Sequence, residues 1–183
     1  MGDYKASGLV LIRAEIDRRG HDGLLREALD PPLYAELRRL VATQWVPIET
    51  ASAMYRACSE VLFGRTPSAL YETGHFAALQ QMRGIYRALL SIVSPTFAMS
   101  QAGKLWSTFH RQGRAWAEKR ALLPDGQTAV LIVADYAELP EDFREQLRGW
   151  IAGLLEVTGV RDIKVQRATL SNGQWVFQGY WRD

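Results

Sequence analysis

A histidine and a tryptophan four residues apart are the first feature of this chain with chemical potential. His110 is one of three histidines and follows Trp106 in the stretch AGKLWSTFHR, residues 102–111. Residues four apart share one face of a helix, so the two rings point the same way if the stretch is helical. The imidazole is then either a ligand for a haem iron or the polar end of a packed helix. We favour the packed end, where the last carbonyls of the helix favour a partly charged imidazole, and keep the haem ligand as the alternative.

Other residues that bind metals or act as nucleophiles form no recognisable set. His21, His75 and His110 lack the spacing of paired ligands on one helix, and Cys58 is the single cysteine. The sequence has no serine nucleophile elbow and no glycine-rich phosphate loop. We therefore predict no metal site, no catalytic residue and a protein that is not an enzyme.

The composition is that of a globular protein with an ordinary charge balance. Of the 183 residues, 48% are apolar and 23% are charged, with a net charge of +2. We expect a single domain, residues 1–183, with no basic arm for nucleic acid. The early apolar run, residues 9–12, is too short for a signal peptide or a membrane span. A lone cysteine fits a reducing compartment, so we expect a cytoplasmic protein.

The first part of the chain, about residues 8–111, is predicted to be helical. Extended backbone is expected at Trp45 and Val46, because a residue before proline avoids helical angles. A helix over 49–63 should stop at Gly64. We then predict one long helix over 68–93 and another over 94–111, opened by a serine and a proline.

The second part, about residues 113–182, is predicted to form a sheet. Strands are expected over 114–122, 128–136, 163–170 and 174–182, with a tight turn at Asn172-Gly173. The run AVLIVA is apolar on both faces, which indicates an interior strand. The fold class is therefore α+β: an N-terminal helical layer packed on a four-stranded antiparallel sheet, with one helix between strands 2 and 3.

Two sets of aromatic residues are expected to fill the space between helices and sheet. The helix from residue 141 has an apolar stripe that includes Phe143, Leu147 and Trp150, and we expect Trp150 to be buried against the sheet. Trp175, Phe177 and Trp181 alternate along the last strand, so their side chains share one face. We favour core positions for these three rings, and keep the wall of an apolar pocket as the alternative.

The segments GIYRALLSIVSPTFAMSQAGKLWSTFHRQGRAWAE and GWIAGLLEVTGVRDIKV carry a family resemblance. They are similar to a myxobacterial paralogous family in which a Gly-hydrophobic-Tyr-Arg helix leads to Ser-Pro-x-Phe and then a Leu-Trp helix. Here those motifs are residues 84–87, 94–97 and 105–106. That family in turn resembles 4-vinyl-reductase-like domains, haem nitric-oxide-binding domains and transport-particle subunits. The resemblance implies a helical layer on a four-stranded sheet, often dimeric, with a hydrophobic cavity.

The haem branch of this superfamily supplies a specific comparison for His110. Its iron-ligating histidine follows an Asn-Leu tract, and laying GKLWSTFH on that tract places Trp106, not His110, at the ligand position. The branch's Tyr-x-Ser-x-Arg clamp for the haem propionates is absent from both YRACS and YRALL. The resemblance therefore implies the fold more strongly than it implies haem.

Our functional hypothesis is a non-enzymatic module that binds a small apolar molecule, or a partner protein, for sensing or signalling. We expect a homodimer without a cofactor. A haem-based gas sensor, with His110 as the iron ligand, is the first alternative. An enzyme acting on an aromatic or tetrapyrrole substrate is the second. The candidate pocket residues are Met82, Tyr86, Trp106, Phe109, Trp175, Phe177 and Trp181.

Overall fold

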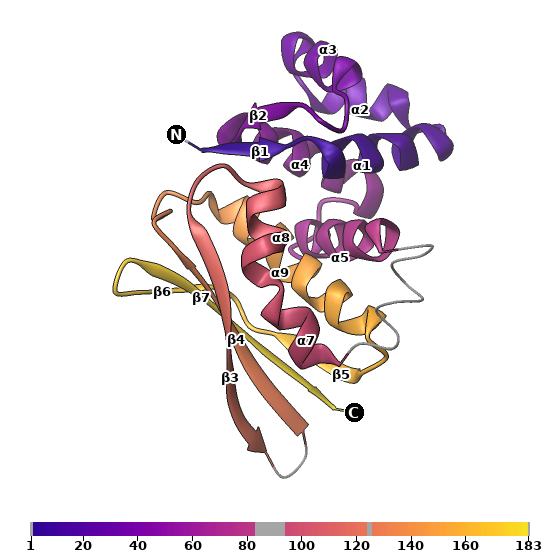
Figure 1. Cartoon of the computed structure of the whole chain (residues 1–183). Helices are drawn as coiled ribbons and strands as arrows, with labels where there is room; N and C mark the ends of the chain where they lie inside the picture. The colour runs from indigo at the N-terminus through magenta and orange to yellow at the C-terminus, as the bar shows by residue number, and fades with distance from the viewer. Residues whose placement is uncertain (1, 83–93, 124–125, 183) are drawn as a thin grey trace.

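A computed structural model describes residues 2–82, 94–123 and 126–182 of the chain. Its N-terminal lobe consists of helices and a two-stranded sheet, and lies beyond one end of the main sheet (Figure 1). The elements of this lobe are β1 (Asp3–Lys5), α1 (Ser7–Arg18), α2 (Asp22–Ala28), α3 (Pro31–Arg39), β2 (Trp45–Pro47) and α4 (Ile48–Phe63).

The N-terminal lobe contains a short two-stranded sheet. The sequence predicted extended backbone for only one of its two strands. β2 covers the predicted Trp45-Val46-Pro47 and pairs antiparallel with β1. No sequence pattern predicted β1, because three residues are too few to show alternation. Gly64 ends α4 with a φ of 77°, as predicted for a helix stop that only glycine adopts readily.

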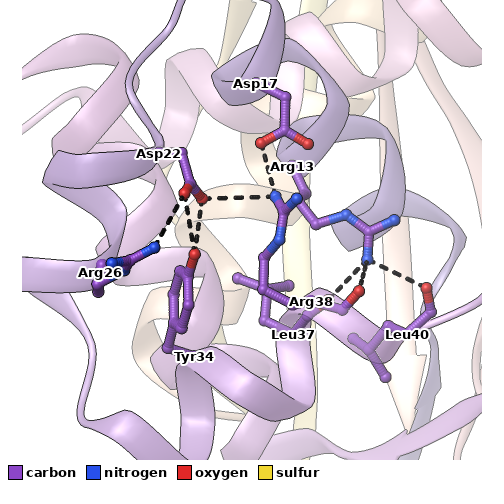
Figure 2. Close-up of polar contacts among 8 residues, drawn as sticks. All are labelled: Arg13, Asp17, Asp22, Arg26, Tyr34, Leu37, Arg38 and Leu40. Atoms are coloured by element: carbon purple, nitrogen blue, oxygen red, sulfur yellow. Dashed lines mark hydrogen bonds and ion pairs between the residues drawn. The ribbon is translucent and has the colours of Figure 1, made fainter.

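A polar network fastens α1, α2 and α3 to one another (Figure 2). The Arg13 guanidinium donates hydrogen bonds to the carbonyl oxygens of Leu37 and Leu40, at 2.7 and 3.1 Å. These carbonyls lie at the C-terminal end of α3, where the last carbonyl oxygens of a helix lack their regular donors from the next turn. Arg38 forms ion pairs with Asp17 and Asp22 at 2.6 and 3.5 Å. The lobe is thus tied together at its surface as well as through its core.

The rest of the described chain is a sheet with helices on one face (Figure 1). The sheet order is β3-β4-β7-β5, with β6 also paired to β7, and every pairing is antiparallel. This arrangement confirms the α+β class and the helix between the second and third predicted strands. The elements are α5 (Ala69–Gln81), α7 (Pro95–Ser100), α8 (Ala102–Phe109), β3 (Arg114–Leu123), β4 (Gly126–Ala134), α9 (Glu141–Val157), β5 (Arg161–Val165), β6 (Thr169–Ser171) and β7 (Gln174–Arg182).

Two predicted elements are divided in the structure. The expected strand 163–170 is split into β5 and β6, because the chain leaves the ladder after Val165, so the sheet has five strands rather than four. The expected helix 94–111 is split into α7 and α8 at Gln101. This break brings Gly103 so close to β3 that an added Cβ would lie 2.9 Å from the Ala115 carbonyl oxygen. The expected helix 68–93 begins at Ala69, and its second half lies outside the described residues.

Glycines allow α5 and α9 to cross in close contact. A Cβ built at Gly74 would overlap the Gln146 carbonyl oxygen, and one at Gly149 would overlap the Tyr71 carbonyl oxygen. A Cβ at Gly153 would lie 2.8 Å from the Ala78 side chain. Small residues spaced four apart let two helix backbones approach, so the Gly149-x-x-x-Gly153 spacing was a usable signal for this contact. The sequence interpretation did not use it.

β4 is the interior strand that its sequence predicts. It lies between β3 and β7, and every residue from Thr128 to Ala134 is buried. Among the residues that the structure describes, none of the helices has the length and apolarity needed to cross a membrane.

Candidate functional site

An apolar cavity of about 60 Å³ lies between α7, α8 and α9 above the sheet. Ala115 of β3 and Leu131 of β4 form its floor, and Tyr4 of β1 reaches it from the N-terminal lobe. The other described walls are mostly carbon, and the polar side chains of the described lining are amides, a tyrosine and one imidazole, with no acidic or basic side chain other than that imidazole. Its aromatic and polar lining consists of Tyr4, Trp106, Phe109, Phe143, Trp150, Gln81, Gln146 and His110.

Trp106 and His110 form a stacked pair at the end of α8. Their ring centroids are 3.8 Å apart and their planes differ by 7°. The helix places the residues one turn apart, and the His110 N–H donates to the Trp106 carbonyl oxygen at 2.8 Å. His110 itself has extended backbone angles, so it ends the helix. The Trp106 indole donates to the Gln112 carbonyl oxygen at 2.9 Å, which fixes the ring that carries the stack.

Strand β1 covers this helix end. Tyr4 forms an isolated β-bridge with His110, and the Arg111 N–H donates to the Asp3 carbonyl oxygen at 3.1 Å. The Tyr4 ring lies 5.4 Å from the His110 ring and 4.8 Å from the Phe143 ring. The cavity is therefore shared between the N-terminal lobe and the helices on the sheet.

His110 is a neutral imidazole because its surroundings exclude water. It is 6% exposed, and this burial lowers its pKa from 6.5 to about 3. Its Nδ1 is buried and has no hydrogen-bond partner among the described residues. We had expected a partly charged imidazole stabilised by the last carbonyls of the helix. That prediction is wrong, because β1 and the neighbouring rings enclose the helix end that the sequence alone left open to solvent.

The tyrosines beside His110 are also uncharged. The hydroxyl groups of Tyr4 and Tyr55 lie 2.8 Å apart and form a hydrogen bond. Burial raises the pKa of Tyr4 to about 12 and that of Tyr55 well above its usual value. The Tyr136 hydroxyl is buried without a partner among the described residues, and burial also raises its pKa to about 12. The whole cluster is thus neutral at physiological pH.

The Trp150 side chain lines the cavity and does not lie buried between α9 and the sheet. Its ring is half-buried, meets Phe109 at 6.1 Å, and donates its indole hydrogen to the Gln81 side chain of α5 at 2.8 Å. Our prediction that Trp150 is buried against the sheet is therefore wrong. α9 packs against both the sheet and α5, so one apolar stripe does not describe its buried surface.

The predicted pocket residues divide between the cavity and the core. Trp106 and Phe109 line the cavity, whereas Met82 is buried at the end of α5 and is not among the described lining residues. Tyr86 lies outside the described residues. The rings of Trp175, Phe177 and Trp181 lie buried in the core on the helix-covered face of β7, away from the cavity lining.

Several lining residues were missed at the sequence level. Tyr4 belongs to a strand without a recognisable pattern, and Gln81 and Gln146 are polar residues that a search for apolar stripes passes over. Phe143 and Leu147 were identified as apolar, but as core residues. Long-range packing brings these side chains together, and no local spacing encodes it.

Metal-binding residues do not cluster in the described part of the chain. No group of three or more histidine, cysteine, aspartate or glutamate side chains there could hold a metal ion. His75 stacks on Tyr71 and pairs with Glu156 at 2.7 Å, away from the cavity.

Comparison with known proteins identifies solved structures with the same fold. No protein-family model and no curated protein matches the sequence. Solved structures match over almost the whole chain. One, described as probing the function of haem distortion in the H-NOX family, is 11% identical, with a TM-score of 0.64 and coverage of 96% of this chain and 94% of that one. The chain has the H-NOX fold.

Two further H-NOX structures give the same result. A protein from S. oneidensis in the Fe(II) ligation state is 11% identical, with a TM-score of 0.62 and coverage of 97% of this chain and 96% of that one. An oxygen-binding H-NOX domain related to soluble guanylate cyclases is 10% identical, with a TM-score of 0.61 and coverage of 94% and 90%. Identity this low shows the H-NOX fold alone, so the cavity's own residues must indicate what it binds.

The residues around this cavity do not fit a haem. A porphyrin is a broad plane, whereas the cavity measures about 60 Å³. Its described lining contains no lysine or arginine to pair with the two propionates. The His110 ring, the one imidazole that lines it, is stacked face to face on Trp106. The cavity instead suits a small uncharged molecule.

Proposed function

We propose that this chain is a non-enzymatic module that binds a small, uncharged apolar molecule in the cavity beneath α8, for sensing or signalling. The observation that carries the proposal is the cavity itself, which has aromatic and aliphatic walls and only neutral polar groups. Binding sites for small molecules are concave, mostly apolar and few in each protein. H-NOX structures with a bound gas, such as the oxygen complex, support a sensor role for this fold.

The chemistry of the described side chains favours binding over catalysis. Burial holds the pKa of His110 near 3, so it is a very weak base at neutral pH. Burial raises the pKa of the Cys58 thiol to about 12, so it is a poor nucleophile. An enzyme acting on an aromatic or tetrapyrrole substrate would need an activated group at the cavity, and the described lining residues provide none.

The size of the cavity limits the ligand. An apolar cavity of about 150 Å³ accommodates benzene or xenon, and this one has less than half that volume. A ligand that enters without moving the walls therefore contains only a few heavy atoms. We further propose that the module acts in the cytoplasm as a homodimer and passes its signal to a partner protein. Sedimentation of the purified chain tests the dimer.

Xenon titration followed by NMR tests the proposed site. Xenon should shift the indole signals of Trp106 and Trp150 in a saturable way. Ala98 is a buried lining residue, so Ala98→Leu should fill the cavity and abolish the shifts. Ala35→Leu, at an exposed position on α3, is the matched control and should leave them unchanged. Equal shifts in Ala98→Leu and wild type would contradict the proposal. Mass spectrometry of an organic extract of the native protein would then search for the natural ligand.

A further inference from the structure

We infer that this chain keeps the H-NOX fold but excludes haem, because the rings packed around His110 enclose its imidazole and the described cavity lining contains no cation for the haem propionates. The inference narrows the ligand class to molecules without a metal porphyrin, and it rests on the proposed use of this cavity as the binding site. The inference depends on three observations: the ring stack, the enclosure of the imidazole, and the lack of charged side chains in the described lining.

An iron ligand needs open space in front of its coordinating nitrogen, whereas the His110 side chain is enclosed by neighbouring rings and is 6% exposed. A histidine that binds iron presents one nitrogen to the metal, and the porphyrin plane lies across that direction. The His110 ring has Trp106 against one face at 3.8 Å, and the rings of Tyr4 and Phe143 each lie 5.4 Å away. Opening the site means breaking the stack and moving β1.

The positions of these rings are fixed by hydrogen bonds outside the stack. The Trp106 indole is bound to the Gln112 carbonyl oxygen, and the Tyr4 hydroxyl is bound to Tyr55. The His110 backbone is held by Trp106 on one side and bridged to Tyr4 on the other. A shift that opened the imidazole would therefore break several contacts together.

The other two histidines and the single cysteine lie away from the cavity lining. His75 pairs with Glu156 at 2.7 Å, and His21 precedes α2 in the N-terminal lobe. Cys58 is fully buried in α4, with its pKa raised to about 12 by burial. All three histidines of the sequence and its one cysteine belong to the described residues. His110 is therefore the one histidine or cysteine placed to serve a haem in this cavity.

Haemin titration of the whole 183-residue chain tests the inference. Haemin is added to wild type and to His110→Phe, and the Soret band is followed in the oxidised and reduced states. Phenylalanine keeps an aromatic ring against Trp106 and removes both nitrogens. An H-NOX domain that carries haem, loaded in the same way, shows that the assay detects binding. Near-ultraviolet circular dichroism shows that His110→Phe is folded.

We expect weak haemin binding that is the same in both proteins within about twofold, and a wild-type protein that is purified without a Soret band. Stoichiometric binding that weakens by more than about tenfold in His110→Phe would overturn the inference. So would tight stoichiometric binding shared by both proteins, because the cavity would then admit a porphyrin. The xenon experiment tests a different claim. If xenon does not bind, the proposed small-molecule site is wrong. If haem binds, the cavity is still a binding site, and only the proposed class of ligand is wrong.

Discussion

Because His110 is neutral in the folded protein, the free energy of unfolding should decrease as the pH is lowered. In the unfolded chain the imidazole has its ordinary pKa of 6.5, and burial lowers the folded-state value to about 3. Between these values the unfolded state binds a proton that the folded state excludes. The stabilisation that depends on a neutral His110 is therefore complete above pH 6.5 and is lost as the pH falls toward 3.

The magnitude follows from the two pKa values. The loss approaches about 1.4 kcal/mol for each pH unit inside this window. Between about pH 8 and pH 5 it amounts to roughly 2 kcal/mol, which is a large share of the stability of a small protein. His110→Phe removes the titrating group and keeps a ring in the stack with Trp106. The unfolding free energy of the variant should therefore fall about 2 kcal/mol less than that of wild type over this interval.

Urea denaturation at the two pH values measures this difference. All other side chains are the same in both proteins, so comparing the two pH dependences isolates His110. The m-value shows whether the extent of unfolding is the same in each case. If both proteins lose the same free energy on acidification, then His110 is not held neutral by burial, and the account of the enclosed helix end fails.

Three further substitutions or reagents test the packing. Trp106→Ala should destabilise the protein by about 3–5 kcal/mol, whereas Trp116→Ala, at a half-exposed position on β3, should have a much smaller effect in the same urea melts. Gly149→Ala should destabilise by at least about 2 kcal/mol because the new Cβ overlaps the backbone of α5; Gly23→Ala, which has open space, should be neutral or stabilising in thermal melts. Cys58 should react with a thiol reagent only as fast as the protein unfolds, and rapid reaction of the native state would show that α4 is not packed as described.

The fold could be predicted further than the cavity, for physical reasons. Strand alternation in β7, the double-sided apolar run of β4 and the turn at Asn172-Gly173 are local signals, and the structure contains all three. The Ser94-Pro95 start of α7 is also local, and the Ser94 hydroxyl accepts a hydrogen bond from the Phe97 N–H. Each of these features depends on residues within a few positions of one another.

Trp106 and Phe109 were predicted as pocket residues, but the rest of the cavity lining could not be predicted, because it is made by contacts between distant segments. Tyr4 meets His110 across more than half of the chain, and no pattern around residue 4 indicates a strand. The same contact reverses the expected charge of His110, because the burial that lowers its pKa comes from another element. Trp150 lines the cavity and donates a hydrogen bond to Gln81 of α5, although its helical spacing places it on a core stripe.

The spacing of four between Trp106 and His110 predicts that the two side chains share one helix face. In the structure the two rings stack on each other. Two flat rings on adjacent turns of a helix can point outward toward a ligand or fold onto one another. In this chain α8 ends at His110, so the imidazole is released from the helix and lies against the indole at 3.8 Å. The helix end and the strand β1 that covers it together make His110 a wall of the cavity.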